Sequence, residues 1–301
     1  MGNIANALKK VGIELVNEPQ IEVQPLATKR SAEQPEAVEP ENRPASVPTS
    51  RRDTPRLPAE PSEPWNERIQ QVLSTPGPVA EAFRVLRSKI LFPKDGKSRP
   101  KTIMVTSSAP EEGKSFVSVN LAAAIAKGLD QFALLVDCDL RRPSLADLLG
   151  MGGENRQGLT EYLQEDAELE DLIVRTAEAK LSLLPSGSPP QNPAELITSV
   201  RMSRLVNELS GRYSDRFIIF DSPPFQVASE SLVLAKKVDG IVIVVGSGKS
   251  DRARIKEMIE TIGREKILGV VFNKEKQGYI KKKMFDPYGG YSNYYSPRQK
   301  K

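Results

Sequence analysis

Short apolar runs recur through the central and C-terminal parts of the chain, and they constrain the fold more than any other feature. Six such runs occur, most of them nearly continuous in Val, Ile and Leu: Thr102 to Thr106, Phe132 to Val136, Leu181 to Leu184, Phe217 to Phe220, Ile241 to Val245 and Ile267 to Phe272. Strands that are apolar on both sides fit a parallel sheet that is buried on both faces. Helical patterns lie between them, at Phe116 to Lys127, Pro193 to Leu209, Ser229 to Lys236 and Arg252 to Ile262. We therefore expect an α/β fold of βαβ units with a mostly parallel sheet and helices on both faces.

The N-terminal residues have a different composition, which predicts a separate organisation. Residues 1–17 place apolar side chains at helical spacing, at Ile4, Leu8, Val11 and Leu15. They predict a short amphipathic helix, either a frayed terminus or a segment that docks on a partner or a membrane surface. Residues 18–64 contain ten prolines and few large apolar residues, so we expect a disordered linker. The folded domain is then expected over 65–278, followed by a disordered, tyrosine-rich tail over 279–301.

Composition excludes several classes of function. The chain of 301 residues has one cysteine and no histidine, and histidine is the commonest metal ligand and the usual base for Ser and Cys nucleophiles. Metalloprotease and serine-hydrolase chemistry are therefore excluded. No apolar run approaches the ~20 residues of a membrane-spanning helix, so we expect a cytoplasmic protein. From Lys274 onward, eight Lys or Arg face two acids, a local basic tail that does not predict a nucleic-acid partner.

The loop that follows the first apolar run predicts phosphate binding. It reads Ser108-Ala-Pro-Glu-Glu-Gly113-Lys114-Ser115, with Ser108 where a phosphate-binding loop has its first glycine. Lys114 would neutralise phosphate oxygens and Ser115 would offer a hydroxyl to Mg²⁺, while backbone N–H groups hold the phosphates. The predicted nucleotide contacts are Ala109, Pro110, Glu111, Glu112, Gly113, Lys114, Ser115 and Phe116. The alternative is a solvated turn between core elements.

Acidic residues end two of the apolar runs. Asp137 and Asp139 follow the second run and Asp221 follows the fourth. The carboxyl ends of parallel strands border the crevice where ligands bind in open sheets. Carboxylates there can hold Mg²⁺ directly or through water, and a closely placed acid can accept the proton of an attacking hydroxyl. Acidic residues also end strands simply because loops are exposed to solvent, but two such strands together with the phosphate loop favour a nucleotide and metal site.

With these residues in place, the chain resembles the bacterial tyrosine kinases (BY-kinases) of capsule and exopolysaccharide biosynthesis. It resembles the cytoplasmic autokinase type, which has no fused membrane domain. The resemblance covers residues 79 to 295 and is carried by four motifs: Ser107 to Ser115, Leu134 to Arg141, Phe217 to Pro224 and Glu81 to Arg87. A further stretch, 184–196, is similar to a loop and helix start of the family. The resemblance implies a deviant P-loop NTPase fold, and Glu111 departs from it because the family commonly has glycine there.

The resemblance also implies roles for particular side chains. Lys114 would contact the phosphates of ATP, Ser115, Asp139 and Asp221 would build the Mg²⁺ site, and Asp137 would be the base or activating acid. Lys114 and the three acids then form the catalytic set. Asn273 is a candidate contact for the adenine, or an ordinary asparagine at a strand end. In the family a helix like the one carrying Glu81, Arg84 and Arg87 docks on a neighbouring subunit and helps to form rings.

The tail is the expected substrate. Five of the seven tyrosines lie in the last 23 residues, and the family phosphorylates such a cluster, commonly in the adjacent subunit of a ring. The expected autophosphorylation sites are Tyr288, Tyr291, Tyr294 and Tyr295. There are two alternatives for the tail: it stacks on single-stranded nucleic acid, or it is a disordered end that adheres non-specifically.

The resemblance implies partners as well. A membrane polysaccharide co-polymerase, the chain-length regulator, would be a separate activator that holds this chain at the inner face of the cell membrane. A phosphotyrosine phosphatase would reverse the modification. The family regulates polysaccharide polymerisation and export in this way.

Two other functions compete with the kinase. A positioning or partition ATPase of the MinD/ParA kind transfers phosphate only to water, and such proteins carry a second lysine five residues before the invariant one. Ala109 occupies that position here, which counts against this class. The third possibility is a regulatory module that binds nucleotide without catalysis. It is supported by Ser108, which replaces the first glycine of the phosphate-binding loop.

Overall fold

The computed structural model describes residues 63–93, 98–152, 156–212, 215–226, 229–248 and 250–274. The amphipathic helix predicted over 1–17, nearly all of the linker predicted over 18–64, and the tail over 279–301 lie outside these residues. The same holds for all four predicted phosphorylation sites. The boundaries of the predicted segments therefore stay predictions.

A seven-stranded sheet forms the centre of the domain, in the order β3-β4-β2-β5-β1-β6-β7. Its strands are β1 (Thr102–Ser107), β2 (Phe132–Asp137), β3 (Val174–Arg175), β4 (Leu181–Leu184), β5 (Arg216–Asp221), β6 (Gly240–Gly246) and β7 (Ile267–Asn273). All neighbours pair in parallel except β3, which is antiparallel to β4. The predicted mostly parallel sheet is confirmed. The two-residue strand β3 was not predicted, because two residues are too few to show a periodic pattern.

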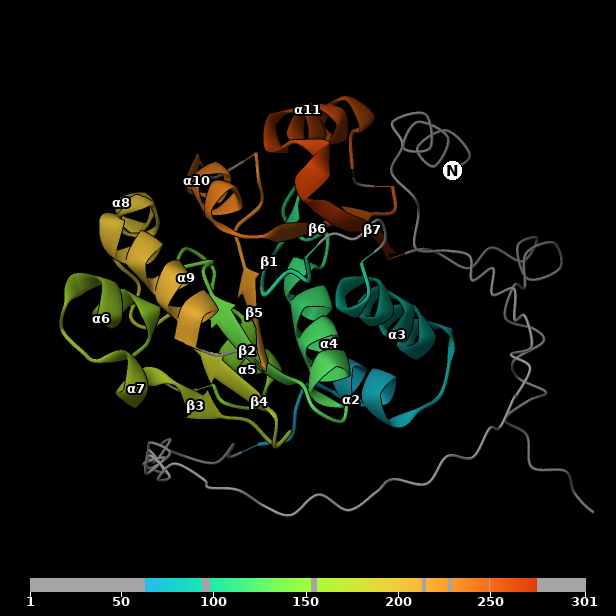
Figure 1. The fold of residues 1–301 in the computed structure, drawn as a ribbon, viewed down its shortest axis with the longest axis horizontal. Helices are drawn as coiled ribbons and strands as arrows, with labels where there is room; N and C mark the ends of the chain where they lie inside the picture. The colour runs from blue at the N-terminus through green and yellow to red at the C-terminus, as the bar shows by residue number, and fades with distance from the viewer. Residues whose placement is uncertain are drawn as a thin grey trace, which may run out of the picture.

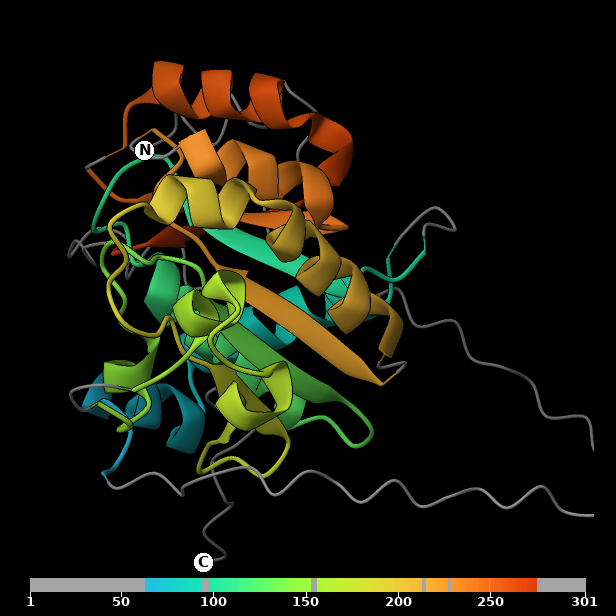
Figure 2. The same cartoon turned by 90° about the vertical axis from the view of Figure 1, so that its left-hand side faces the viewer.

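Helices cover both faces of this sheet, as Figures 1 and 2 show. On one face lie α2 (Glu67–Ser74), α3 (Pro78–Leu91), α4 (Lys114–Ala126) and α5 (Leu145–Leu148). On the other lie α6 (Leu159–Gln164), α7 (Leu169–Leu172), α8 (Pro193–Thr198), α9 (Val200–Arg212), α10 (Ser229–Lys237) and α11 (Arg252–Ile262). A short 3₁₀ turn, η1 (Arg264–Lys266), precedes β7.

Successive residues of each central strand supply the two cores in turn. Ile103 and Val105 of β1 pack with the α3 and α4 side, whereas Met104 between them packs with the opposite side. This alternation is the two-residue period of a strand, and both sides are apolar because helices cover both. Every residue of β1 is buried, which explains why its sequence shows a continuous apolar run.

One predicted helix is wrong in its extent. The pattern from Pro193 to Leu209 predicted a single helix, but the structure has α8 and α9 with a break at Ser199. Ser199 has an extended backbone, with ψ at 161°. Its hydroxyl accepts a hydrogen bond from the backbone N–H of Met202 at 3.0 Å, the geometry of a residue that starts a new helix. Serine competes with helix continuation in this way.

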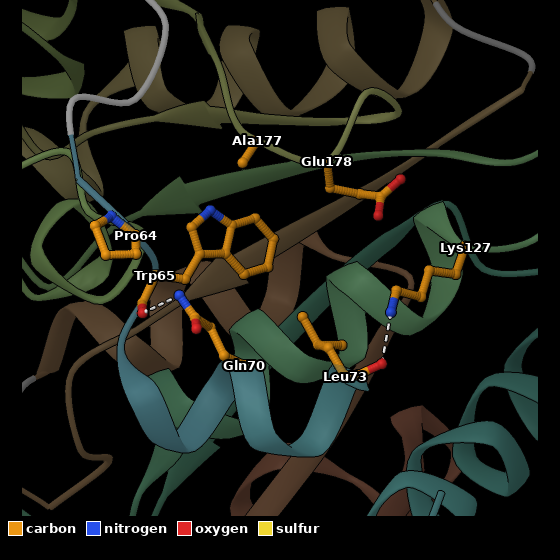
Figure 3. Close-up of a pocket in the computed structure, with 7 residues that line it drawn as sticks. All are labelled: Pro64, Trp65, Gln70, Leu73, Lys127, Ala177 and Glu178. Carbon is orange, nitrogen blue, oxygen red and sulfur yellow. Dashed lines mark hydrogen bonds between the residues drawn. The ribbon is translucent and has the colours of Figure 1, made fainter. Parts of the chain in front are cut away.

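A pocket of about 250 Å³ lies at the amino-terminal ends of the strands, far along α4 from its first turn. Figure 3 shows Trp65 between the turn at Ala177 and Glu178, on one side, and Leu73 and Lys127 on the other. Lys127 donates to the carbonyl oxygen of Leu73 at 2.8 Å. This pocket is remote from the strand ends that carry the acids. None of the helices among the described residues is long and apolar enough to span a bilayer.

Candidate active site

The phosphate loop connects β1 to the first turn of α4. Gly113 immediately precedes α4 with φ at 94°, a left-handed conformation that suits glycine. A β-carbon on this residue would overlap the side-chain amide of Asn273. Glu111 also has a positive φ, at 60°, which is unusual for a residue with a side chain. The loop therefore bends through two left-handed positions before Lys114 begins the helix.

The end of β7 holds this loop in place. The side-chain Nδ2 of Asn273 donates to the carbonyl oxygen of Glu112 at 2.9 Å. The next residue, Lys274, donates from Nζ to the carbonyl oxygen of Glu111 at 2.6 Å. The sequence prediction made Asn273 a contact for adenine, and the structure places its amide against the phosphate loop. Asn273 and Lys274 therefore bind the loop through two of its carbonyl oxygens.

The side chain of Glu112 has a structural place within the loop. It is completely buried, and its Oε2 accepts from the backbone N–H of Ala109 at 2.8 Å. Its Oε1 accepts from the backbone N–H of Gly246 at 3.2 Å and from the hydroxyl of Ser250. Glu112 thus ties the phosphate loop to the end of β6. Its carboxylate is turned into the protein, so the side chain of Glu112 is not available to a nucleotide.

Lys114 lies among the acids at the carboxyl ends of β2 and β5. Its Nζ is 2.8 Å from Oδ2 of Asp139. Burial alone would lower the pKa of Lys114, but attraction from Asp221 and from Asp139 outweighs burial and raises it. The lysine is therefore a permanent cation beside the loop, as binding to phosphate oxygens requires.

The acids meet because β2 and β5 are neighbours and end in register. Asp137 pairs with Asp221 in the sheet. The backbone N–H of Cys138 donates to the carbonyl oxygen of Asp221 at 2.8 Å. Asp137, Asp139 and Asp221 are 1%, 3% and 0% exposed. All three are therefore interior groups and not solvent-exposed acids that follow a strand.

Asp137 has the most perturbed environment. Burial, reinforced by repulsion from Asp221, raises its pKa to about 7. Its Oδ2 accepts from the backbone N–H groups of Ser144 and Leu145, at 3.1 and 3.0 Å, and its Oδ1 accepts from that of Asp139 at 3.2 Å. These bonds fix the carboxylate and the loop after β2. A carboxyl with a pKa near neutrality has the proton affinity of a general base.

Asp221 has a free oxygen in the interior. Its Oδ1 accepts from the hydroxyl of Ser118 at 3.0 Å, while Oδ2 is buried and has no hydrogen-bond partner among the described residues. Burial raises the pKa of Asp221 to about 6, against the opposing influences of Lys114 and of hydrogen bonding by Ser115. Ser118 was missed by the sequence analysis, although it lies one helical turn beyond Ser115 on the same face of α4.

The oxygen donors at this site suit Mg²⁺ bound together with water and phosphate oxygens better than a cation bound by protein side chains alone. Within the described parts of the chain, no three His, Cys, Asp or Glu side chains converge on a common point. The oxygen donors near Lys114 include the unpartnered Oδ2 of Asp221, the hydroxyl of Ser115 and the carboxylate of Asp139. Mg²⁺ is usually held by one or two carboxylates together with water and substrate phosphates.

The predicted oligomerisation residues all lie on α3, but they differ in their surroundings. Arg84 and Glu81 form an ion pair of 2.8 Å and are both partly exposed. Arg87 instead donates from Nη1 to the carbonyl oxygen of Ala124 on α4, at 2.9 Å. Arg84 is thus available to another molecule, whereas Arg87 joins two helices of its own chain.

Comparisons with known proteins place the chain among nucleotide-binding proteins. The CobQ/CobB/MinD/ParA nucleotide binding domain model matches residues 103–286. The tyrosine-protein kinase YwqD of Bacillus subtilis is 35% identical over 200 residues, which are 65% of this chain and 81% of YwqD. The crystal structure of the chimerical protein CapA2B2 superposes with a TM-score of 0.62 at 33% identity, covering 71% of this chain and 93% of that one.

A more distant match concerns the fold alone. The cell division ATPase MinD of Pyrococcus furiosus superposes with a TM-score of 0.51 at 21% identity, over 60% of this chain and 74% of MinD. Its lower identity and coverage make the kinases the better comparison.

Proposed function

Because this chain belongs to the bacterial tyrosine kinases, within the CobQ/CobB/MinD/ParA nucleotide-binding family, we propose that it is an ATP-dependent protein-tyrosine autokinase. Its substrates would be the tyrosines of its own C-terminal tail. The observation that carries the proposal is the buried cluster of Lys114, Asp137, Asp139 and Asp221 beside the phosphate loop.

The residues divide the chemistry among them. Backbone N–H groups of residues 111–116 and Nζ of Lys114 bind the phosphates of ATP, and the helix N-terminus of α4 adds its positive end. Ser115, Asp139 and Asp221 hold Mg²⁺, which when bound supplies charge neutralisation for the phosphate oxygens. Asp137 accepts the proton of the tyrosine hydroxyl, in keeping with its pKa of about 7. Exclusion of water by this buried site favours transfer to tyrosine over hydrolysis.

The tail would be phosphorylated in trans within a ring whose contacts include Arg84 of α3. The chain leaves β7 beside the phosphate loop, because Lys274 contacts Glu111. Tyr288 follows Lys274 by 14 positions, a separation that spans at most about 50 Å, so reach alone permits transfer to either the same or a neighbouring site. Each phosphate would add about −1.5 to −2 charges to a basic tail and weaken its attraction to the acidic crevice.

The cellular role would be regulation of exopolysaccharide or capsule polymerisation and export. A membrane polysaccharide co-polymerase would activate the kinase and hold it at the inner face of the membrane, and a phosphatase would remove the phosphates. The N-terminal segment would be part of this tether.

The test incubates the purified full chain, with and without its activator, with ATP and Mg²⁺, and maps phosphotyrosine by mass spectrometry. Lys114→Ala should lower phosphorylation by about 100-fold or more, since it removes a preorganised charge from the phosphates. Lys256→Ala, which changes an exposed lysine of α11, is the matched control and should have no effect.

A mixing experiment resolves the direction of transfer. Lys114→Ala protein with an intact tail is mixed with protein whose tail tyrosines are all changed to Phe. Phosphate on the Lys114→Ala chain establishes transfer in trans. ATP hydrolysis by wild type without any phosphotyrosine, even with the activator present, would favour the positioning ATPase and refute the kinase.

A further inference from the structure

An ion pair connects the loop after β2 to the helix after β5. Nε of Arg141 lies 2.9 Å from Oε1 of Glu230. Arg141 follows Asp139 by two residues, and Glu230 is the second residue of α10. The pair therefore joins the loop after β2, which carries Asp139, to the helix after β5, the strand that ends at Asp221.

The two partners are unequally buried. The side chain of Glu230 is 2% exposed, whereas that of Arg141 is 47% exposed. The second carboxylate oxygen of Glu230 is buried and has no hydrogen-bond partner among the described residues. An acid near the start of a helix is favoured by the helix dipole, but that explains neither its burial nor its pairing. Burial of a carboxylate with one oxygen unbonded is costly unless a fixed cation compensates it.

The ion pair of Arg141 and Glu230 lies close to the acids of the site. Asp137 and Asp221 are directly opposite one another in the sheet, and the backbone hydrogen bond from Cys138 to Asp221 follows at the end of their two strands. Asp139 lies beyond that bond, in the loop, where Lys114 contacts it. The ion pair of Arg141 and Glu230 is a second connection, on the far side of Asp139. The loop segment that carries Asp139 is therefore held at both ends.

We propose that Glu230 and Arg141 are positioning residues that set the location of Asp139 relative to Asp221. The inference rests on the proposed function, in which these two acids hold Mg²⁺. Mg²⁺ demands near-ideal octahedral geometry at short distances, so a displacement of one carboxylate reduces activity even when the nucleotide still binds. Residues outside the metal ligands that orient them commonly change metal affinity or activity by about 10–100-fold.

The experiment compares Glu230→Gln, Arg141→Gln and the double variant with wild type. For each protein one measures kcat and KM for ATP hydrolysis, the Mg²⁺ concentration for half-maximal activity, tail phosphorylation and thermal stability. Glu230→Gln preserves the shape of a buried side chain and removes its charge, whereas Arg141→Gln changes a half-exposed side chain and leaves the buried carboxylate of Glu230 without its cation. The double variant removes both charges together. The matched controls are Glu170→Gln and Arg212→Gln, which remove an exposed pair of 2.6 Å where α9 ends, away from the acids.

Positioning predicts that kcat falls about 10–100-fold in both variants and that half-maximal Mg²⁺ rises, while KM for ATP stays at the wild-type value. The double variant should be no worse than either single one, because each removes the same connection. The control variants should keep wild-type kcat and Mg²⁺ dependence.

Two results would overturn the proposal. One is wild-type kcat and Mg²⁺ dependence in Arg141→Gln. The other is a loss of thermal stability in Glu230→Gln with no change in kcat or in Mg²⁺ dependence. Inactivity of wild type towards tyrosine refutes the kinase function. Active wild type with fully active Arg141→Gln refutes only the positioning role.

Discussion

The contact between Gly113 and Asn273 gives the sharpest prediction about the phosphate loop. Gly113→Ala adds a β-carbon at a residue with φ at 94°, where it would overlap the amide of Asn273. Asn273 would have to move, and its 2.9 Å hydrogen bond to the carbonyl oxygen of Glu112 would be lost. We therefore expect the variant to be less stable than wild type.

The magnitude follows from three contributions. A left-handed backbone costs an L-residue about 1–2 kcal/mol, and loss of one hydrogen bond costs about 0.5–1.5 kcal/mol. Alanine recovers about 0.4–1 kcal/mol by restricting the unfolded chain. The free energy of unfolding should thus fall by about 2 kcal/mol, which corresponds to about 4–8 °C in Tm for a domain of this size.

Urea unfolding of four proteins measures the effect: wild type, Gly113→Ala, Asn273→Ala and the double variant. In the Asn273→Ala background the amide is absent, so Gly113→Ala should cost about 1 kcal/mol less. Gly211→Ala is the control, because a β-carbon there meets no other atom within 4 Å, and it should not destabilise the protein. An equal cost of Gly113→Ala in both backgrounds would refute the contact as its cause.

Three further predictions concern the surrounding residues. Glu111→Gly should be more stable than Glu111→Ala by about 1 kcal/mol, since only alanine keeps the strain of a positive φ; urea unfolding with alanine as stable as glycine would contradict this. Arg87→Ala should lower the free energy of unfolding by about 1–3 kcal/mol because it frees the carbonyl of Ala124. Arg84→Ala should change the free energy of unfolding by less than about 0.5 kcal/mol. An equal loss in both variants would contradict a special role for the hydrogen bond between Arg87 and Ala124. The raised pKa of Asp221, about 6, means that its neutral form stabilises the nucleotide-free fold at pH 4 and that this contribution disappears as the pH rises through 6. Asp221→Asn should therefore gain stability relative to wild type between pH 4 and 8 without Mg²⁺, and a difference independent of pH would contradict the burial of this charge.

The strands and the acidic strand ends were predictable because they depend on local pattern. Each buried parallel strand needs apolar residues on both faces, so its sequence is continuous in Val, Ile and Leu. Asp137 and Asp221 stand out because they end such runs. The helix predicted over 193–209 shows the limit of this reasoning. Helical periodicity continues through Ser199, where the extended backbone divides α8 from α9 and the hydroxyl accepts a hydrogen bond from the N–H of Met202.

The sequence by itself determined the parallel sheet, the phosphate loop and the three carboxylates near it, because periodicity and loop chemistry are local properties of the chain. Tertiary structure alone decided which side chains support that site. Asn273 is 161 residues from Glu112, and Glu230 is 89 residues from Arg141. Nothing in their local sequence distinguishes them from an ordinary strand end and an ordinary helix start. Their roles arise from strand order, because placing β5 beside β2 and bringing β7 to the phosphate loop creates contacts between segments that are distant in the chain.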